Sequence, residues 1–332
     1  MSKIANPENR ILVIQTAFLG DIVLASSFLN NLRNLCRNSE IRFLTTPAGA
    51  KVFDPNPMGV VAIPYDKRGN DAGFGGFLRI ARELGNFAPD LVFCLHRSLR
   101  SALLAKISGG KIYGFEDAAG SVLFHHRVKR PKGVFEAEKN HQLLLAWKGS
   151  EAEGMSAFPL LSFSEKDRQE GEALLSRLPA SSFIAIAPSS VWATKRWPAE
   201  YFGDLAERLW DRFALPIVLV GGREPADLKC ASEVEMHSPR LVEQGAIFNL
   251  VGKTGIGTLK SVLSRAGLVI ANDSAPLHIA IAVGAPVLGI FGPTTRELGF
   301  FPNAPVGKSA VAEIGGLACR PCGLHGHHQC PQ

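Results

Sequence analysis

Several features that mark other protein classes are scarce or absent in this 332-residue chain. Six cysteines are too few for a disulfide scaffold, and no Gly-x-Gly-x-x-Gly follows the first apolar run, which argues against an NAD-dependent oxidoreductase. The longest uncharged run, 274–295, is interrupted by proline and glycine, so it predicts a helix, a turn and a strand instead of a membrane span. The N-terminal residues show no signal-peptide pattern. We therefore expect a cytoplasmic protein.

Composition indicates a folded protein with a modest basic excess. Hydrophobic residues make up 46% of the chain and charged residues 20%, which excludes a disordered or fibrous protein. At roughly 150 residues per domain the length predicts two domains. The net charge of +6 fits acidic ligands such as phosphates. Without a zinc finger or an aromatic-rich basic patch, we expect no nucleic-acid partner.

Apolar runs and amphipathic stretches alternate along both halves of the chain, which is typical of βαβ units. Strands are predicted at 11–15, 41–45, 60–63, 91–95 and 111–115, and helices at 21–35, 74–86, 98–108 and 140–147. After a linker-like stretch at 148–164, strands are predicted at 183–187, 217–220, 247–251, 268–272 and 287–291, and helices at 199–213, 225–236, 257–266 and 275–283. The pattern predicts two α/β domains with Rossmann-like parallel sheets, with ligands bound beyond the carboxyl ends of the strands in a cleft between the domains.

The first predicted strand leads into the motif QTAFLGDIVLAS. Gly20 allows a tight turn into the helix, and Asp21 stands at the expected helix start. Asp is a preferred N-cap residue, so capping alone would explain Asp21. A carboxylate at this edge of a sheet could instead act as a general base. Both interpretations are open from the sequence.

A loop with cationic and hydroxyl side chains follows the strand predicted at 183–187. Its candidates for binding a pyrophosphate are Ser189, Ser190, Thr194, Lys195 and Arg196. A solvated surface loop is the alternative, although Trp192 and Trp197 beside the cations are unusual for such a loop.

Two further strand ends carry candidate ligand-binding groups. Glu224 follows a Gly pair, where an acid can accept hydrogen bonds from ribose hydroxyls, although Glu is also common in a first helical turn. Asp273 and Ser274 precede a helix whose free N–H groups could bind an anion. His278 lies one turn further and could donate to a phosphate oxygen, or could be an ordinary core residue.

The combined motifs resemble the heptosyltransferases of lipopolysaccharide core assembly, inverting glycosyltransferases of family 9 with the GT-B fold. The resemblance covers about residues 10–300 and rests on LGDIVLAS, EKNHQLLLA, PSSVWATKRWPAEYF, LVGGREPAD and the block from NLVGKTG to IFGPT. It implies that Asp21 is the general base, Lys195 binds phosphate, Glu224 binds ribose and Thr254 lies near the adenine. Asp273, Ser274 and His278 then match the block that holds the nucleotide diphosphate. Ala275 stands where the family usually has Gly.

The resemblance also implies a reaction. Heptose would pass from ADP-heptose to a sugar hydroxyl of a lipopolysaccharide precursor (lipid A-core), on an enzyme bound peripherally at the cytoplasmic face of the inner membrane. No Asp-x-Asp occurs in the chain, which fits a mechanism without a metal cofactor. Candidate contacts to an anionic acceptor are Arg97, Arg100, Arg127 and Arg130. The alternatives are a GT-B enzyme with another donor, an epimerase, or a non-catalytic ADP-sugar-binding module.

We expect three parts in the chain: an acceptor-binding domain at 1–160 that carries the base, a nucleotide-sugar-binding domain at 165–310, and a Cys/His-rich tail at 311–332. In the tail, Cys319, Cys322 and Cys330 could bind zinc together with an imidazole, because Cys-x-x-Cys is a common half-site. A reactive or disordered tail is the alternative.

Overall fold

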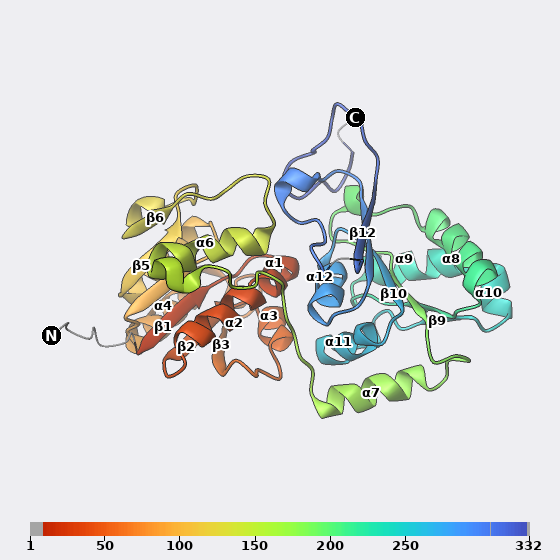
Figure 1. The fold of residues 1–332 in the computed structure, drawn as a ribbon, viewed down its shortest axis with the longest axis horizontal. Helices are drawn as coiled ribbons and strands as arrows, with labels where there is room; N and C mark the ends of the chain where they lie inside the picture. Colours follow the sequence, from red (N-terminus) through yellow and green to blue (C-terminus); the bar gives the residue numbers. More distant parts are fainter. Residues whose placement is uncertain (1–8, 306, 331–332) are drawn as a thin grey trace. The chain divides into compact units, whose positions relative to one another are not determined.

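The computed structural model describes residues 9–305 and 307–330. These form two compact units, which meet in the sequence between Pro159 and Leu160: unit 1 before that point and unit 2 after it (Figure 1). Residues 1–8, 306, 331 and 332, which belong to the expected domains and tail, lie outside the described residues. Each unit is described by itself.

Unit 1 is built on a six-stranded parallel sheet. Its elements are β1 (Arg10–Ile14), α1 (Leu19–Leu24), α2 (Ser26–Leu35), β2 (Glu40–Thr45), α3 (Pro47–Val52), β3 (Val60–Pro64), α4 (Gly73–Phe87), β4 (Leu91–Cys94), α5 (Leu99–Ser108), β5 (Lys111–Phe115), η1 (Ser121–Leu123), β6 (His126–Val128), α6 (Glu136–Lys148) and η2 (Gly149–Ala152). The strand order is β3-β2-β1-β4-β5-β6.

Helices cover both faces of this sheet, so its central strands are apolar on both sides. Leu12 and Ile14 of β1 belong to a core that includes residues of α4 and α5. On strand β4, the ring of Phe93 contacts Phe28 of α2, with 5.2 Å between the ring centroids, and Trp147 of α6, with 5.4 Å. Successive side chains of each strand point to opposite faces of the sheet, so the strand contributes to a separate core on each face.

Unit 2 repeats the same architecture. Its elements are α7 (Glu165–Leu175), β7 (Ile184–Ala187), η3 (Ala193–Lys195), α8 (Ala199–Phe213), β8 (Ile217–Leu219), α9 (Pro225–Met236), α10 (Pro239–Glu243), β9 (Ile247–Asn249), α11 (Ile256–Ser264), β10 (Leu268–Asn272), α12 (Ala275–Ala282), β11 (Val287–Phe291), η4 (Arg296–Leu298) and β12 (Ser309–Glu313). The order β12-β11-β10-β7-β8-β9 is again fully parallel. Counted from the start of each unit, both sheets have the order 3-2-1-4-5-6.

The α/β class with two parallel sheets is confirmed, and most predicted elements agree with the structure to within a few residues. The single helix predicted at 21–35 is wrong: α1 starts at Leu19, and Ala25 separates α1 from α2. At this break the Ser27 hydroxyl donates to the Leu24 carbonyl oxygen, a bond that competes with regular helix geometry. The short elements α3, β6, α10 and β12, and the polar helix α7, were not predicted. Within the described ranges, no helix combines the length and the hydropathy needed to span a bilayer.

Candidate functional site

Each sheet has one point where the strand order reverses, between β1 and β4 in unit 1 and between β7 and β10 in unit 2. In open parallel sheets of this type, ligands bind beyond the carboxyl ends of the strands at such a switch point. The residues that directly follow these four strands are therefore the first place to look for chemistry.

In unit 2, a buried ion pair spans the switch point. Lys195, in η3 of the loop after β7, places its Nζ 2.5 Å from Oδ2 of Asp273, which directly follows β10. The side chains are 10% and 4% exposed. Thr294, in the loop after β11, donates its hydroxyl to the same Oδ2 at 2.8 Å. One carboxylate therefore connects the loops that follow three neighbouring strands.

A second polar residue holds the two central strand ends together. The Asn272 side chain donates to the Pro188 carbonyl oxygen at 2.7 Å and accepts from the Trp197 backbone N–H at 3.0 Å. Asn272 is fully buried, so these two bonds fix both ends of the loop that carries Lys195. Sequence reasoning did not single out Asn272 or Thr294, although both stand where parallel strands end.

Helix α12 begins at this pair. Ser274 is its N-cap residue, with its hydroxyl donating to the Asn272 carbonyl oxygen at 3.2 Å. Ala275 is the first helical residue and has no positive φ, so a glycine is not required there for backbone conformation. Lys195 pairs with Asp273, the residue before this N-cap, and both a cation and a helix N-terminus favour an anion.

His278 lies one turn into α12 and is 3% exposed. Burial lowers its pKa to about 4; Asp273 acts in the opposite direction and Lys195 adds to the lowering. The ring is therefore neutral at pH 7. Its Nδ1 is buried and has no hydrogen-bond partner among the described residues. A neutral imidazole here can hydrogen-bond to a ligand without adding a charge to the buried pair.

Other residues predicted for unit 2 occupy the same edge of the sheet but are engaged in different ways. The Ser189 hydroxyl donates to Asp227 in the first turn of α9. The Ser190 carbonyl oxygen accepts a hydrogen bond from the Arg196 guanidinium at 2.6 Å. Glu224 is the exposed N-cap residue of α9, and Thr254, half-buried, precedes α11. The remaining predicted residue, Thr194, forms hydrogen bonds with the backbone of His327.

In unit 1, the switch point carries a compact polar group. Nδ1 of His96, after β4, lies 3.0 Å from Oγ1 of Thr16, after β1, and 2.9 Å from Oγ of Ser101 in α5. Burial lowers the pKa of His96 to about 4, and Lys67 and Arg97 add to the lowering. The imidazole is neutral at pH 7, so it joins the two strand ends by hydrogen bonds alone.

Asp21 follows Thr16 of this group along the chain. It is the third residue of α1 and is half-buried. The N-cap residue of α1 is Phe18, so the interpretation of Asp21 as an N-cap is wrong. Its carboxylate nevertheless lies in the first turn of α1, where the free N–H groups interact favourably with negative charge.

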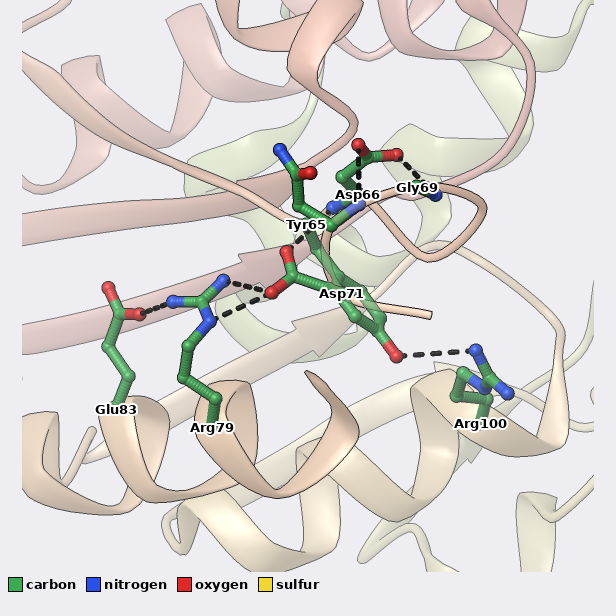
Figure 2. A network of polar contacts seen from close by, with 8 residues as sticks. Tyr65, Asp66, Gly69, Asp71, Arg79, Glu83 and Arg100 are labelled. Carbon is green, nitrogen blue, oxygen red and sulfur yellow. Dashed lines mark hydrogen bonds and ion pairs between the residues drawn. The ribbon is translucent and has the colours of Figure 1, made fainter. Parts of the chain in front are cut away.

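The loop between β3 and α4 also carries cations, and Figure 2 shows the polar contacts of Asp66 and Asp71 in this loop. Asp66 and Asp71 hold this loop in shape. The Asp66 N–H donates to the Asp71 carboxylate at 3.0 Å, and Arg79 of α4 pairs with the same carboxylate at 2.7 Å. Lys67 of this loop donates to the Thr16 carbonyl oxygen at 2.6 Å, and its partial burial lowers its pKa, an effect to which nearby Arg68 and Arg100 add. Sequence reasoning missed Lys67.

The four arginines predicted to contact an acceptor are distributed over two regions of unit 1. Arg100, at the start of α5, donates to the Tyr65 hydroxyl at 3.3 Å (Figure 2), and Arg97 pairs with Asp117 at 2.9 Å. Arg127 is exposed on β6, whereas Arg130 pairs with Glu136 at the start of α6.

Lys139 of α6 lies behind that second pair and was not singled out from the sequence. Its side chain is 2% exposed and lies 3.2 Å from the Glu136 carboxylate. Burial lowers the pKa of Lys139, Glu136 counteracts this, and Arg130 and Arg97 add to the lowering. Arg97 and Arg130 are therefore electrostatically coupled to one buried lysine.

The tail cysteines are free thiols: Cys319 and Cys330 are exposed, and Cys322 is half-buried. Across the part of the chain that the structure describes, no group of three or more His, Cys, Asp or Glu side chains is arranged to hold a metal ion. The zinc site at Cys319, Cys322 and Cys330 thus stays a prediction.

Two doubly wound parallel sheets, each with charged and polar side chains at its switch point, define a two-unit α/β protein with sheets of the Rossmann-like type. The family model of glycosyltransferase family 9 (heptosyltransferase) matches residues 77–327. The chain belongs to this family and is a glycosyltransferase.

Relatives and solved structures agree with this assignment. The chain is 24% identical to lipopolysaccharide heptosyltransferase 1 of Pseudomonas aeruginosa, over 94% of this chain and 86% of that protein. A family 9 glycosyltransferase of Veillonella parvula has a TM-score of 0.78 at 25% identity, covering 94% of this chain and 89% of that one. The E. coli ADP-heptose lipopolysaccharide heptosyltransferase II has a TM-score of 0.76 at 20% identity, covering 94% and 95%. The GT-B fold is thereby confirmed.

Proposed function

We propose that this protein transfers a heptose from ADP-heptose to a sugar hydroxyl of a lipopolysaccharide core precursor, with inversion at the anomeric carbon and without a metal cofactor. The observation that carries the proposal is the buried pair of Lys195 and Asp273 at the start of α12, on a sheet of the nucleotide-binding type. The donor class is supported by the similarity to the E. coli ADP-heptose lipopolysaccharide heptosyltransferase II.

The donor would bind at the switch point of unit 2. There the Lys195 ammonium and the N–H groups at the start of α12 would stabilise the negative charge that develops on the departing diphosphate. His278, being neutral, would contribute a hydrogen bond only. Glu224 would accept from the ribose hydroxyls and Thr254 would lie near the adenine. Ser189 and Ser190 shape the wall of this site through their bonds to Asp227 and Arg196.

In the proposed reaction, Asp21 takes the proton of the acceptor hydroxyl as that oxygen forms its bond to the anomeric carbon. The bond between this carbon and the diphosphate oxygen breaks on the opposite face, and its electron pair leaves with ADP. The absence of an Asp-x-Asp motif supports a mechanism in which the protein's own cations and helix dipole neutralise the leaving group.

Acceptor binding would use the cations of unit 1. Lys67 and Arg100 lie at the strand ends near Thr16, so they would contact carboxylates or phosphates close to the reacting hydroxyl. Arg97, Arg127 and Arg130 would contact more distant parts of the acceptor. Because that acceptor is a lipid, we also propose peripheral association with the cytoplasmic membrane face.

The test is an Asp21→Asn variant assayed with ADP-heptose and truncated lipopolysaccharide acceptors. Removing a general base typically costs about 10²–10⁴-fold in turnover, so transfer should fall by that amount while ADP binding is unchanged. Asp204→Asn, at an exposed acid of α8, is the matched control and should retain full activity. Transfer by Asp21→Asn at the wild-type rate would show that Asp21 is not the base.

A further inference from the structure

The segment 316–330, which follows β12, lies against two loops of unit 2. One is the loop 188–198 after β7, which carries Lys195, and the other is the loop 292–295 after β11, which carries Thr294. Both loops lead to the Asp273 carboxylate, through the ammonium of Lys195 and the hydroxyl of Thr294. Any group that holds these two loops together also sets the position of the Lys195 ammonium.

The contact with the first loop is formed at Thr194, the residue before Lys195. The Thr194 hydroxyl accepts from the His327 backbone N–H at 2.7 Å, and the Thr194 backbone N–H donates to the His327 carbonyl oxygen at 3.1 Å. The ring of Trp192 lies near two imidazoles of the segment, with 4.8 Å between its centroid and that of His328 and 6.2 Å to that of His325. The segment thus contacts the loop on both sides of Ala193.

The contact with the second loop is equally specific. The Cys322 backbone N–H donates to the Pro293 carbonyl oxygen at 2.8 Å. The guanidinium of Arg320 donates to the Thr294 carbonyl oxygen at 2.5 Å and pairs with Glu313 of β12 at 2.8 Å. The Arg320 side chain is only 7% exposed, so its bond to Thr294 is partly buried, whereas its partner Glu313 is 35% exposed.

Gly326 occupies the place where the two loops meet. A Cβ at this residue would lie 2.7 Å from the Thr194 hydroxyl, 3.2 Å from Pro293 Cγ and 3.5 Å from Lys195 Cγ. The residue also has a φ of +76°, which favours glycine. The backbone of the segment therefore packs directly on the stem of Lys195.

We propose that residues 316–330 form a clasp that positions Lys195 to bind the donor diphosphate, with Thr194, Arg320 and Gly326 as its positioning residues. This inference rests on the proposed donor site, since it assigns a role to groups that act through Lys195. The clasp restrains the ammonium before the donor arrives, so less conformational freedom is lost on binding. The hydroxyl of Thr194 thereby acts on the clasp instead of on the donor.

The chain offers a matched pair of variants for the test. Gly326 and Gly323 both have positive φ, at +76° and +83°, so an alanine is strained to a similar extent at either position. Only at Gly326 does the added Cβ meet the loops, because it has nothing within 4 Å at Gly323. In titration calorimetry with ADP, Gly326→Ala should weaken binding by about tenfold, because a displaced ammonium loses part of its charge-assisted interaction with the diphosphate. Gly323→Ala should leave the ADP affinity at the wild-type value.

A second pair addresses the hydroxyl contact. Thr194→Val removes the acceptor for His327, whereas Thr194→Ser retains it, so Ser should restore most of the ADP affinity that Val loses. In steady-state assays the KM for the donor should rise in Gly326→Ala and Thr194→Val while the KM for the acceptor stays constant. A loss of folded protein would instead lower the apparent kcat alone.

The outcomes separate the clasp from the proposed donor site, using Lys195→Met as the reference. If Lys195→Met weakens ADP binding but Gly326→Ala and Thr194→Val bind ADP as their controls do, the clasp is overturned and the donor site stands. If Lys195→Met binds ADP like the wild type, the donor site is overturned and the clasp with it. Weakened binding in all three variants supports the clasp if Gly323→Ala binds ADP like the wild type and Thr194→Ser recovers most of the affinity that Thr194→Val loses.

Discussion

Breaking the buried pair of Lys195 and Asp273 should destabilise unit 2 as well as remove the donor's cationic partner. In Lys195→Met the Asp273 carboxylate, 4% exposed, keeps the Thr294 hydroxyl but loses its counter-charge. Removing one partner of a buried ion pair costs about 3–5 kcal/mol, because the remaining charge stays desolvated. Lys195→Met should therefore lower the free energy of unfolding of unit 2 by about that amount.

The double variant Lys195→Met/Asp273→Asn separates the two effects. It leaves no net buried charge, and the Asn side-chain oxygen can still accept from Thr294. Contacting residues are non-additive in double-mutant cycles, by up to about 3 kcal/mol. We expect the double variant to be more stable than Lys195→Met, while ADP binding stays lost because the ammonium is absent in both.

Urea unfolding followed by tryptophan fluorescence measures these stabilities. Trp192, Trp197 and Trp210 belong to unit 2, and only Trp147 belongs to unit 1, so the fluorescence change reports mainly on the unit that carries the pair. A cost below about 1 kcal/mol for Lys195→Met, as exposed pairs show, would refute the reasoning. So would destabilisations that simply add in the double variant.

Two other predictions concern stability alone. Burial lowers the pKa of His278 to about 4, and the unfolded value is near 6.5, so the unfolded chain binds the extra proton first as the pH falls. This stabilisation is fully present above pH 6.5 and declines between pH 6.5 and 4 by roughly 3 kcal/mol. His278→Gln should therefore make the urea midpoint of unfolding less dependent on pH in that range. An unchanged pH dependence would contradict a neutral buried His278. Separately, Ala214 is the C-cap residue of α8 and has a φ of +50°, so Ala214→Gly should raise the thermal midpoint through a gain of about 0.5–1 kcal/mol. Ala226→Gly, at the second residue of α9, should instead lower the midpoint, because its alanine has ordinary helical geometry. A lower midpoint in both variants would show that Ala214 is unstrained.

Much of the fold was predictable because parallel sheets leave a strong signal. Strands such as β7 and β10 are buried on both faces and read as continuous apolar runs, and long amphipathic helices such as α8 show a clear 3.6-residue period. The elements that escaped prediction are short, like α10 and β12, or polar, like α7, which has one buried residue, Gly171. Such elements depend on tertiary contacts more than on their own periodicity.

Some residues of the candidate site could likewise be predicted from the sequence, and others could not. Residues in the segments that follow strands, such as Asp273 directly after β10 and Lys195 in the loop after β7, could be identified because strand ends meet at one edge of a sheet. Asn272, Thr294 and His96 could not, because their importance lies in hydrogen bonds to residues far away in the chain.

The sequence by itself therefore determined the α/β class, the order of the elements and the strand ends that carry candidate functional residues. These features follow from local periodicity and from the positions where polar residues interrupt apolar runs. Only the tertiary structure decided which of those polar groups meet. It paired Lys195 with Asp273 and folded the tail back onto Thr194, because strand order and chain reversal bring together residues that are 78 and 133 positions apart. It also decided that His278 is neutral, because desolvation depends on the atoms packed around the ring and leaves no trace in the sequence.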